Sequence, residues 1–137
     1  MKMEKEIRIT NNLEEVSSLC TFVEELCEEL GLSAETTMNI NLALEEAVVN
    51  IIMYAYPERE QHDILLSATY QPQQLIFLLT DNGQPFDPTQ VNCADVSSSI
   101  EERPVGGLGI FLIRNIMNEV SYLRLDGKNQ LIMKKNI

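Results

Sequence analysis

The chain has 137 residues, of which 45% are hydrophobic and 23% charged, and this length and composition predict one globular domain, 1–137, with a real core. The formal net charge of −11 argues against direct binding of nucleic acid, which needs a basic surface, and permits a basic protein partner. No run approaches 18 apolar residues and no apolar secretory segment follows Met1, so neither a membrane span nor export is expected.

Hydrophobic periodicity predicts one strand and two helices in the first half of the chain. Residues 6–9 alternate in polarity, as in a half-buried strand. Apolar residues at helical spacing over 13–30 predict a helix that Gly31 ends. Ser33 caps a second helix, which Pro57 ends. The apolar stripe of this second helix consists of Ile40, Leu44, Ala47, Ile51 and Ala55.

Six glutamates cluster on the first of these helices. They form either a solvated helix face or a docking surface for a basic protein. The cluster comprises Glu14, Glu15, Glu24, Glu25, Glu28 and Glu29.

Paired strands dominate the second half of the chain. Residues 64–70 and 75–80 are β-prone runs joined by a short turn, which favours an antiparallel hairpin. A second pair, 120–125 and 130–134, turns at 126–129, and the serine- and proline-containing segment 88–105 suits a mobile lid. Antiparallel pairs with about three helices on one face predict an α+β two-layer sandwich, with a mixed but mostly antiparallel sheet.

Cysteine and histidine usage points to a reducing compartment. Cys20, Cys27 and Cys93 are an odd number and include no C-x-x-C pair, so buried thiols in the cytoplasm are expected rather than a disulfide framework. His62 is the single histidine, which argues against a metal cluster.

Two polar residues interrupt the apolar second helix. Glu46 and Asn50 are four residues apart, so they are neighbours on one face, at the border of the core stripe. A carboxylate and an amide oxygen there could hold a ligand or a metal ion. Taken alone, the pair is explained more simply by a solvated Glu and a helix-surface Asn.

Two glycine-containing segments supply the rest of a candidate site. Asp81-Asn82-Gly83 follows a buried strand, where the turn could present the Asp81 carboxylate to a cleft. Gly106-Gly107-Leu108-Gly109 leads into a helical apolar pattern, and such an entry lets backbone N–H groups approach a phosphate. An ordinary turn and a glycine hinge are the alternatives for each segment by itself.

The three motifs together, in this order, resemble the ATP-binding motifs shared by DNA gyrase, heat-shock chaperones, mismatch-repair proteins and sensor histidine kinases. Within that superfamily the chain looks most like the small anti-sigma-factor serine kinases of bacteria, whose motifs read close to E-A-V-x-N-x-I-x-H-x-Y, D-x-G-x-x-F-D and G-G-x-G-x-x-L-I. They stand here at 46–56, 81–87 and 106–113. The resemblance covers nearly the whole chain and implies a histidine-kinase-like ATPase (Bergerat) fold.

The resemblance also implies a role for each motif residue, with ATP or ADP and Mg²⁺ as ligands. Glu46 would be the general base, and Asn50 would ligate Mg²⁺. Asp81 would accept a hydrogen bond from the adenine amino group, and Gly83 would let the backbone pass close to the base. The residues that would offer N–H groups to the phosphates are Gly107, Leu108 and Gly109.

The function implied by the resemblance is phosphorylation of a serine on an antagonist (anti-anti-sigma) protein and sequestration of a sigma factor, by a protein that forms homodimers. The chain departs from the family pattern where Tyr54 replaces a common His and Pro85 replaces a second Gly. Arg103 is either the cation for the γ-phosphate or an exposed arginine. The alternatives are a nucleotide-gated binding module without phosphoryl transfer, a degenerate structural relative, and a detached histidine-kinase-like ATPase domain.

Overall fold

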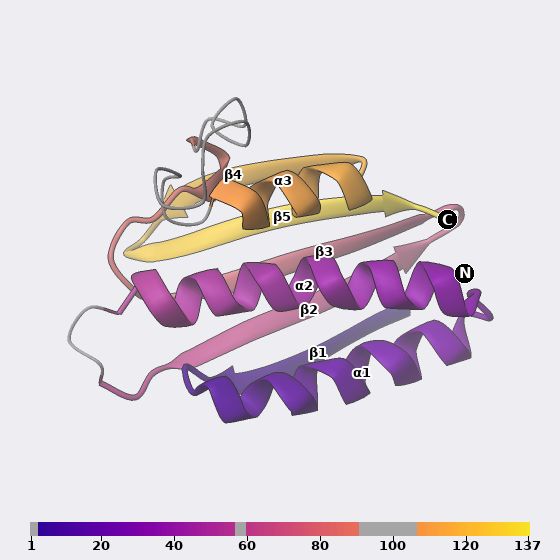
Figure 1. The fold of residues 1–137 in the computed structure, drawn as a ribbon, viewed down its shortest axis with the longest axis horizontal. Helices are drawn as coiled ribbons and strands as arrows, with labels where there is room; N and C mark the ends of the chain where they lie inside the picture. The colour runs from indigo at the N-terminus through magenta and orange to yellow at the C-terminus, as the bar shows by residue number, and fades with distance from the viewer. Residues whose placement is uncertain (1–2, 57–59, 91–106) are drawn as a thin grey trace.

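A five-stranded sheet carries three helices on one face (Figure 1). The computed structural model describes residues 3–56, 60–90 and 107–137. The elements in chain order are β1 (Met3–Thr10), the 3-10 turn η1 (Leu13–Glu15), α1 (Val16–Glu29), α2 (Ala34–Tyr54), β2 (Asp63–Gln71), β3 (Gln74–Asp81), the 3-10 turn η2 (Pro88–Gln90), α3 (Gly107–Ile116), β4 (Glu119–Leu125) and β5 (Lys128–Asn136).

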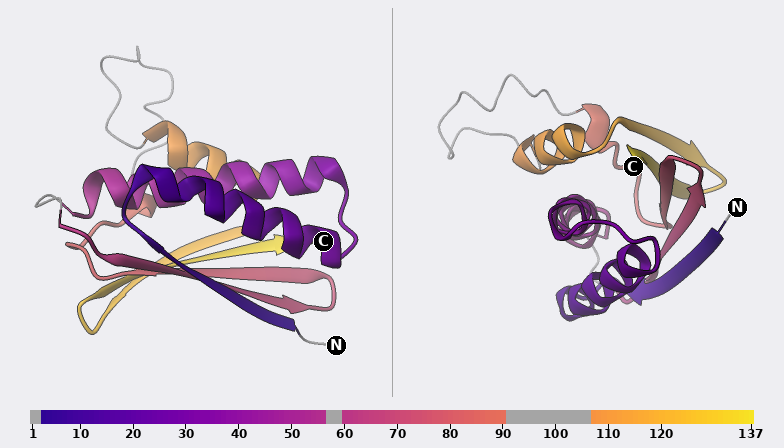
Figure 2. Two further views of the ribbon diagram at one scale, coloured as in Figure 1. Left: turned by 90° about the horizontal axis from the view of Figure 1, so that it is seen from below. Right: turned by 90° about the vertical axis from the view of Figure 1, so that its right-hand side faces the viewer.

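The strand order is β1-β2-β3-β5-β4, and every pairing among the described strands is antiparallel. Figure 2 shows the two layers from the side, with the helices over one face of the sheet. The predicted α+β two-layer sandwich is confirmed, but the described sheet is wholly antiparallel rather than mixed. In the described part of the chain, no helix is both long enough and apolar enough to cross a membrane.

The central helix α2 forms where the apolar periodicity predicts it. The Ser33 side chain accepts a hydrogen bond from the backbone N–H of Thr36 at 3.1 Å, which satisfies one N–H group of the first turn. Gly31, at φ +70°, ends the preceding helix in a conformation that glycine adopts without steric cost. The predicted stripe of α2 is buried against the sheet and comprises Ile40, Leu44, Ala47, Ile51 and Ala55.

The register of β3 against β5 determines which residues meet at the end of the sheet. Alternate side chains of β3, from Leu75 through Phe77 and Leu79 to Asp81, lie on the buried face. Asp81 pairs with Asn129 across the sheet, and Asn129 in turn pairs with Arg124. A carboxylate therefore occupies the last core-facing position of a central strand.

Several boundaries differ from those expected. The first strand begins at Met3, because its pairing with β2 continues beyond the alternating stretch. The last turn is tighter than 126–129: Asp126 and Gly127 both have positive φ, and Asn129 belongs to β5. Of the predicted lid, 88–90 forms η2 and 91–105, with Cys93 and Arg103, lies outside the described residues.

Candidate functional site

Glu46 and Asn50 of α2 lie against the first turn of α3. Glu46 is half-buried, and Asn50 is 7% exposed. A Cβ placed on Gly109 would lie 3.1 Å from Glu46 Oε2 and 3.2 Å from Asn50 Nδ2. Because glycine has no side chain, both polar groups fit between the two helices. The structure thus brings together three of the residues that the sequence singles out.

The carboxamide of Asn50 is enclosed and incompletely hydrogen-bonded. Its Nδ2 is buried and has no acceptor among the described residues. An unsatisfied buried N–H group costs about 1–3 kcal/mol, so its presence here favours a ligand that completes it. The amide can turn over and present either its nitrogen or its oxygen. A single amide oxygen, with phosphate oxygens and water, is a shell that Mg²⁺ accepts, so Asn50 fits a magnesium–nucleotide ligand.

The N-terminus of α3 lies beside this pair. The helix begins at Gly107, so the backbone N–H groups of Gly107, Leu108 and Gly109 belong to the first turn, which has no carbonyl partners within the helix. The positive end of the helix dipole favours an anion at this point. The first turn of α3 therefore suits phosphate oxygens close to Glu46 and Asn50.

Asp81 is almost completely enclosed and 3% exposed. Its Oδ1 accepts hydrogen bonds from the backbone N–H of Gly83 and from Asn129 Nδ2, both at 2.9 Å. Burial raises the pKa of the Asp81 carboxyl group, and these two hydrogen bonds and the nearby Arg124 only partly oppose it. Both hydrogen bonds end on Oδ1, so the carboxylate is held in one orientation by the protein itself.

The turn after Asp81 is hydrogen-bonded to the end of α2 and packs closely against it. The Gln84 N–H donates to the Ala55 carbonyl at 2.8 Å, and Gln84 Nε2 donates to the Tyr54 carbonyl at 2.8 Å. A Cβ on Gly83 would lie only 2.4 Å from the Ala55 carbonyl oxygen. Position 83 therefore requires glycine for close backbone packing, and this packing fixes the turn relative to α2.

Asn129 is the site residue that sequence reasoning missed. Its Nδ2 donates to Asp81 Oδ1 and to the Gln84 carbonyl, and its Oδ1 accepts from Tyr122 Oη and from Arg124 Nη1. Arg124 Nη1 also donates to the Gly83 carbonyl at 2.7 Å. These contacts depend on the register between strands, so the sequence could reveal Asn129 only if β5 were placed opposite β3 at this register.

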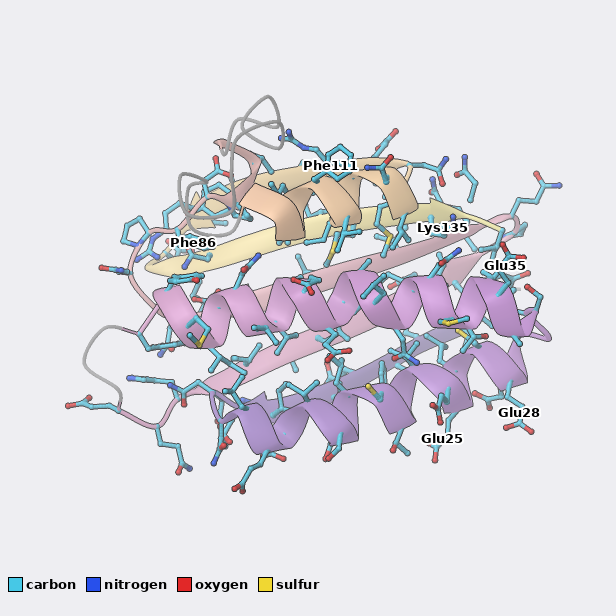
Figure 3. All side chains as sticks on the ribbon, in the orientation of Figure 1. Glu25, Glu28, Glu35, Phe86, Phe111 and Lys135 are labelled. Atoms are coloured by element: carbon cyan, nitrogen blue, oxygen red, sulfur yellow. The ribbon has the colours of Figure 1, made fainter. Side chains whose placement is uncertain are left out.

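A narrow hollow with a free volume of only about 10 Å³ is lined by Asp81, Asn50 and Asn129. Its mostly apolar walls with a few convergent polar groups are typical of a ligand site, but its volume is far below the roughly 300–1,000 Å³ of a small-molecule pocket, so a nucleotide does not fit it as it stands. Phe86 lies at the end of the molecule where α2 ends (Figure 3), and its ring packs against Tyr54. The apolar walls are Ala47, Ile51, Phe86, Ile113, Tyr122 and Leu131. A wider hollow elsewhere contains none of the predicted site residues and is lined in part by Asn11, Leu13, Met53, Tyr56 and Gln61.

The sheet is antiparallel and is covered by helices on one face. Polar side chains line a hollow beside the glycine-rich start of α3. Together these features define an α+β nucleotide-binding domain. A family model described as the histidine kinase-like ATPase domain matches residues 9–135. The chain belongs to this family, on the branch that contains the serine/threonine-protein kinases described next.

Two relatives are named as protein kinases. The chain is 31% identical over 101 residues to the serine/threonine-protein kinase BtrW of Bordetella bronchiseptica, a match covering 74% of this chain and 71% of BtrW. It is 26% identical over 133 residues to the serine-protein kinase RsbW of Bacillus cereus, covering 94% of this chain and 82% of RsbW.

Solved structures agree on the fold. The chain matches the crystal structure of the RsbU and RsbW domains of a Mycobacterium tuberculosis protein with a TM-score of 0.71 and 13% identity, over 98% of this chain and 32% of that one. It matches a chain of the SiaB–SiaC complex from Pseudomonas aeruginosa with a TM-score of 0.58 and 13% identity, over 96% of this chain and 89% of that one. The chain therefore spans about a third of the mycobacterial protein.

Proposed function

We propose that this chain is an ATP-dependent protein serine kinase of the anti-sigma type, which phosphorylates an antagonist protein and sequesters a sigma factor. The observation that carries the proposal is the convergence of Glu46, Asn50 and Gly109 from two helices, beside a narrow hollow that Asp81 lines. The naming of BtrW and RsbW as protein kinases supports the reaction class. A cytoplasmic location and a homodimer accompany the proposal, as in the anti-sigma kinases that the sequence resembles.

The nucleotide would be held at three points. Asp81 has one oxygen held by two donors, so its Oδ2 is the oxygen best placed to accept a hydrogen bond from the adenine amino group. The first N–H groups of α3 would bind phosphate oxygens. The Asn50 carboxamide would hold Mg²⁺, which neutralises phosphate charge when bound.

Glu46 is the group we assign to proton transfer. Its Oε2 lies against the first turn of α3, where it would accept a proton from a serine hydroxyl. It lies beside Asn50 on the same helix face, on the side of α2 that contacts α3. A base at this point would act on a hydroxyl that reaches the phosphate-binding end of the site.

The test is transfer of radiolabelled γ-phosphate from ATP to the small protein encoded next to this chain, with ADP-dependent thermal shift as the measure of nucleotide binding. Glu46→Gln should retain the thermal shift and lose transfer by at least about a hundredfold. Glu45→Gln is the matched control, because Glu45 is also half-buried but lies about 100° around α2 from Glu46, on the side away from α3. Equal loss in both variants would reject Glu46 as the base, and absence of any nucleotide-dependent shift would reject the proposal as a whole.

A further inference from the structure

A row of apolar side chains lies exposed on the side of α2 that faces away from the sheet. Met38, Leu42, Val49 and Met53 are separated by four, seven and four residues, which places them on one helix face opposite the core stripe. Met38 is 66% exposed, Met53 is 54% exposed and Leu42 is 39% exposed, whereas Val49 is half-buried. We call these four residues the outer stripe, which extends about 22 Å along the helix.

The outer stripe runs directly past the proposed base. Glu46 follows Leu42 by four residues and precedes Val49 by three, so it is a surface neighbour of both. Beyond Glu46, on the far side from the stripe, lies Gly109 of α3. A protein that covers the outer stripe therefore has its surface beside the Glu46 carboxylate.

The helix that carries the outer stripe and the helix α1 beside it are acidic. Helices α1 and α2 contain no lysine or arginine and seven glutamates, namely Glu24, Glu25, Glu28, Glu29, Glu35, Glu45 and Glu46. Figure 3 shows Glu25 and Glu28 projecting from α1 on the side away from α2, and Glu35 near the start of α2. Of the seven, only Glu29 forms an ion pair among the described residues, with Lys5.

One acidic group adjoins the stripe on the side of α1. Glu45 follows Leu42 by three residues, so it flanks the stripe opposite Glu46. Burial raises the pKa of the Cys20 thiol, and the charges of Glu45 and Glu24 raise it further, as expected if both carboxylates lie near this seam between the helices. The stripe is thus apolar along its length and bordered by carboxylates on both sides.

We propose that the outer stripe is the docking surface for the substrate protein, which contributes a segment of apolar side chains flanked by lysine or arginine. The inference rests on the proposed kinase function and adds the surface by which the acceptor reaches Glu46. A second copy of the chain is a poor occupant, because two acidic borders would face each other. An anionic lipid surface is disfavoured for the same reason.

The first experiment maps binding with a defined probe. The probe is a helical peptide that repeats the spacing of the outer stripe in leucines and carries lysines at intervening positions, and its control has glutamates in place of the lysines. Of the six methionines, Met38 and Met53 lie on the stripe, whereas Met117 and Met133 are buried in the core. In NMR spectra of methyl-labelled methionine, the lysine peptide should shift the signals of Met38 and Met53 and leave those of Met117 and Met133 unchanged.

The second experiment uses substitutions in the intact chain. Met38→Gln and Met53→Gln should each weaken peptide binding by about threefold to tenfold, because each removes an apolar contact and keeps the length of the side chain. The same variants should raise KM for the acceptor protein to a similar extent while leaving kcat and the ADP-dependent thermal shift unchanged. Leu125→Gln is the matched control, since Leu125 is 50% exposed on β4 and lies away from α2.

The outcomes distinguish failure of the docking surface from failure of the kinase function. Phosphoryl transfer with an unchanged KM in both methionine variants would overturn the docking inference and leave the kinase function intact. Binding of the lysine peptide without any change at Met38 and Met53 would also overturn it, because attraction to the acidic surface alone would then explain binding. Stripe-specific binding without transfer to any acceptor would support the docking surface and count against the kinase function.

Discussion

Replacement of Gly109 by alanine should separate the stability of the protein from its activity. Gly109 lies in the first turn of α3, where a helix gains about 0.5–1 kcal/mol when glycine becomes alanine. In a domain of this size that gain raises Tm by roughly 2–4 °C. Among the described residues, the nearest neighbours of the added Cβ are the ends of two side chains, which can shift without movement of the backbone.

The same methyl group intrudes on the candidate site. It would lie 3.1 Å from Glu46 Oε2 and 3.2 Å from Asn50 Nδ2, so each group must retreat by a few tenths of an ångström. A displacement of about 1 Å at a catalytic centre typically costs about a hundredfold in rate. A retreat of a third of that distance in two groups should therefore lower phosphoryl transfer by about threefold to tenfold.

Two measurements on the same sample test this prediction. Thermal denaturation without nucleotide should show an equal or higher Tm for Gly109→Ala, and the transfer assay should show the loss of rate. Gly127→Ala is the control, because Gly127 has φ +75° and no atom near its Cβ position, so alanine should lower Tm and leave transfer intact. A fall in Tm for Gly109→Ala, or full transfer, would refute the assignment of this contact.

Three other substitutions probe the floor of the hollow. Burial raises the pKa of Asp81, so its charged form destabilises the fold. Asp81→Asn should therefore have a higher Tm than the wild type at pH 8, with a smaller difference at pH 5, and should lose the ADP-dependent shift. A difference in Tm that grows as pH falls would contradict this. Asn129→Ala should cost about 2–4 kcal/mol in urea unfolding and weaken ADP binding at least tenfold, whereas exposed Asn118→Ala should cost under about 1 kcal/mol and spare binding. Gly83→Ala should cost about 1–3 kcal/mol beyond Gly31→Ala, which adds strain but meets no neighbour, and equal losses would refute the close packing.

The sequence predicted most of the fold because the signals are local. The stripe of α2 has the 3.6-residue period of a helix packed on a sheet, and the Ser33 cap is a property of one residue and its neighbours. The hairpin of β2 and β3 follows from two β-prone runs close in sequence. Glu46, Asn50 and Asp81 are conspicuous in the sequence because they are polar residues among apolar ones.

The remaining features depend on distance in space rather than in sequence. Asn129 bonds to a residue 48 positions earlier, and the contact exists only because β5 pairs with β3 at one register. The need for glycine at position 83 comes from the Ala55 carbonyl at the end of another element. Neither contact produces a periodic pattern in the sequence, so each can be recognised only in the three-dimensional structure.

A single helix joins the core, the candidate nucleotide site and the proposed docking surface. One side of α2 packs on the sheet through residues such as Leu44, a second side presents Asn50 to α3, and the third exposes Met38 and Met53. Each residue advances the helix by about 100°, so inserting one residue between Leu44 and Glu46 would rotate every later side chain out of its sector. The positions of the three sides of α2 are therefore fixed relative to one another. If substrate docking and proton transfer both take place on α2, the exposed apolar row has to lie beside Glu46.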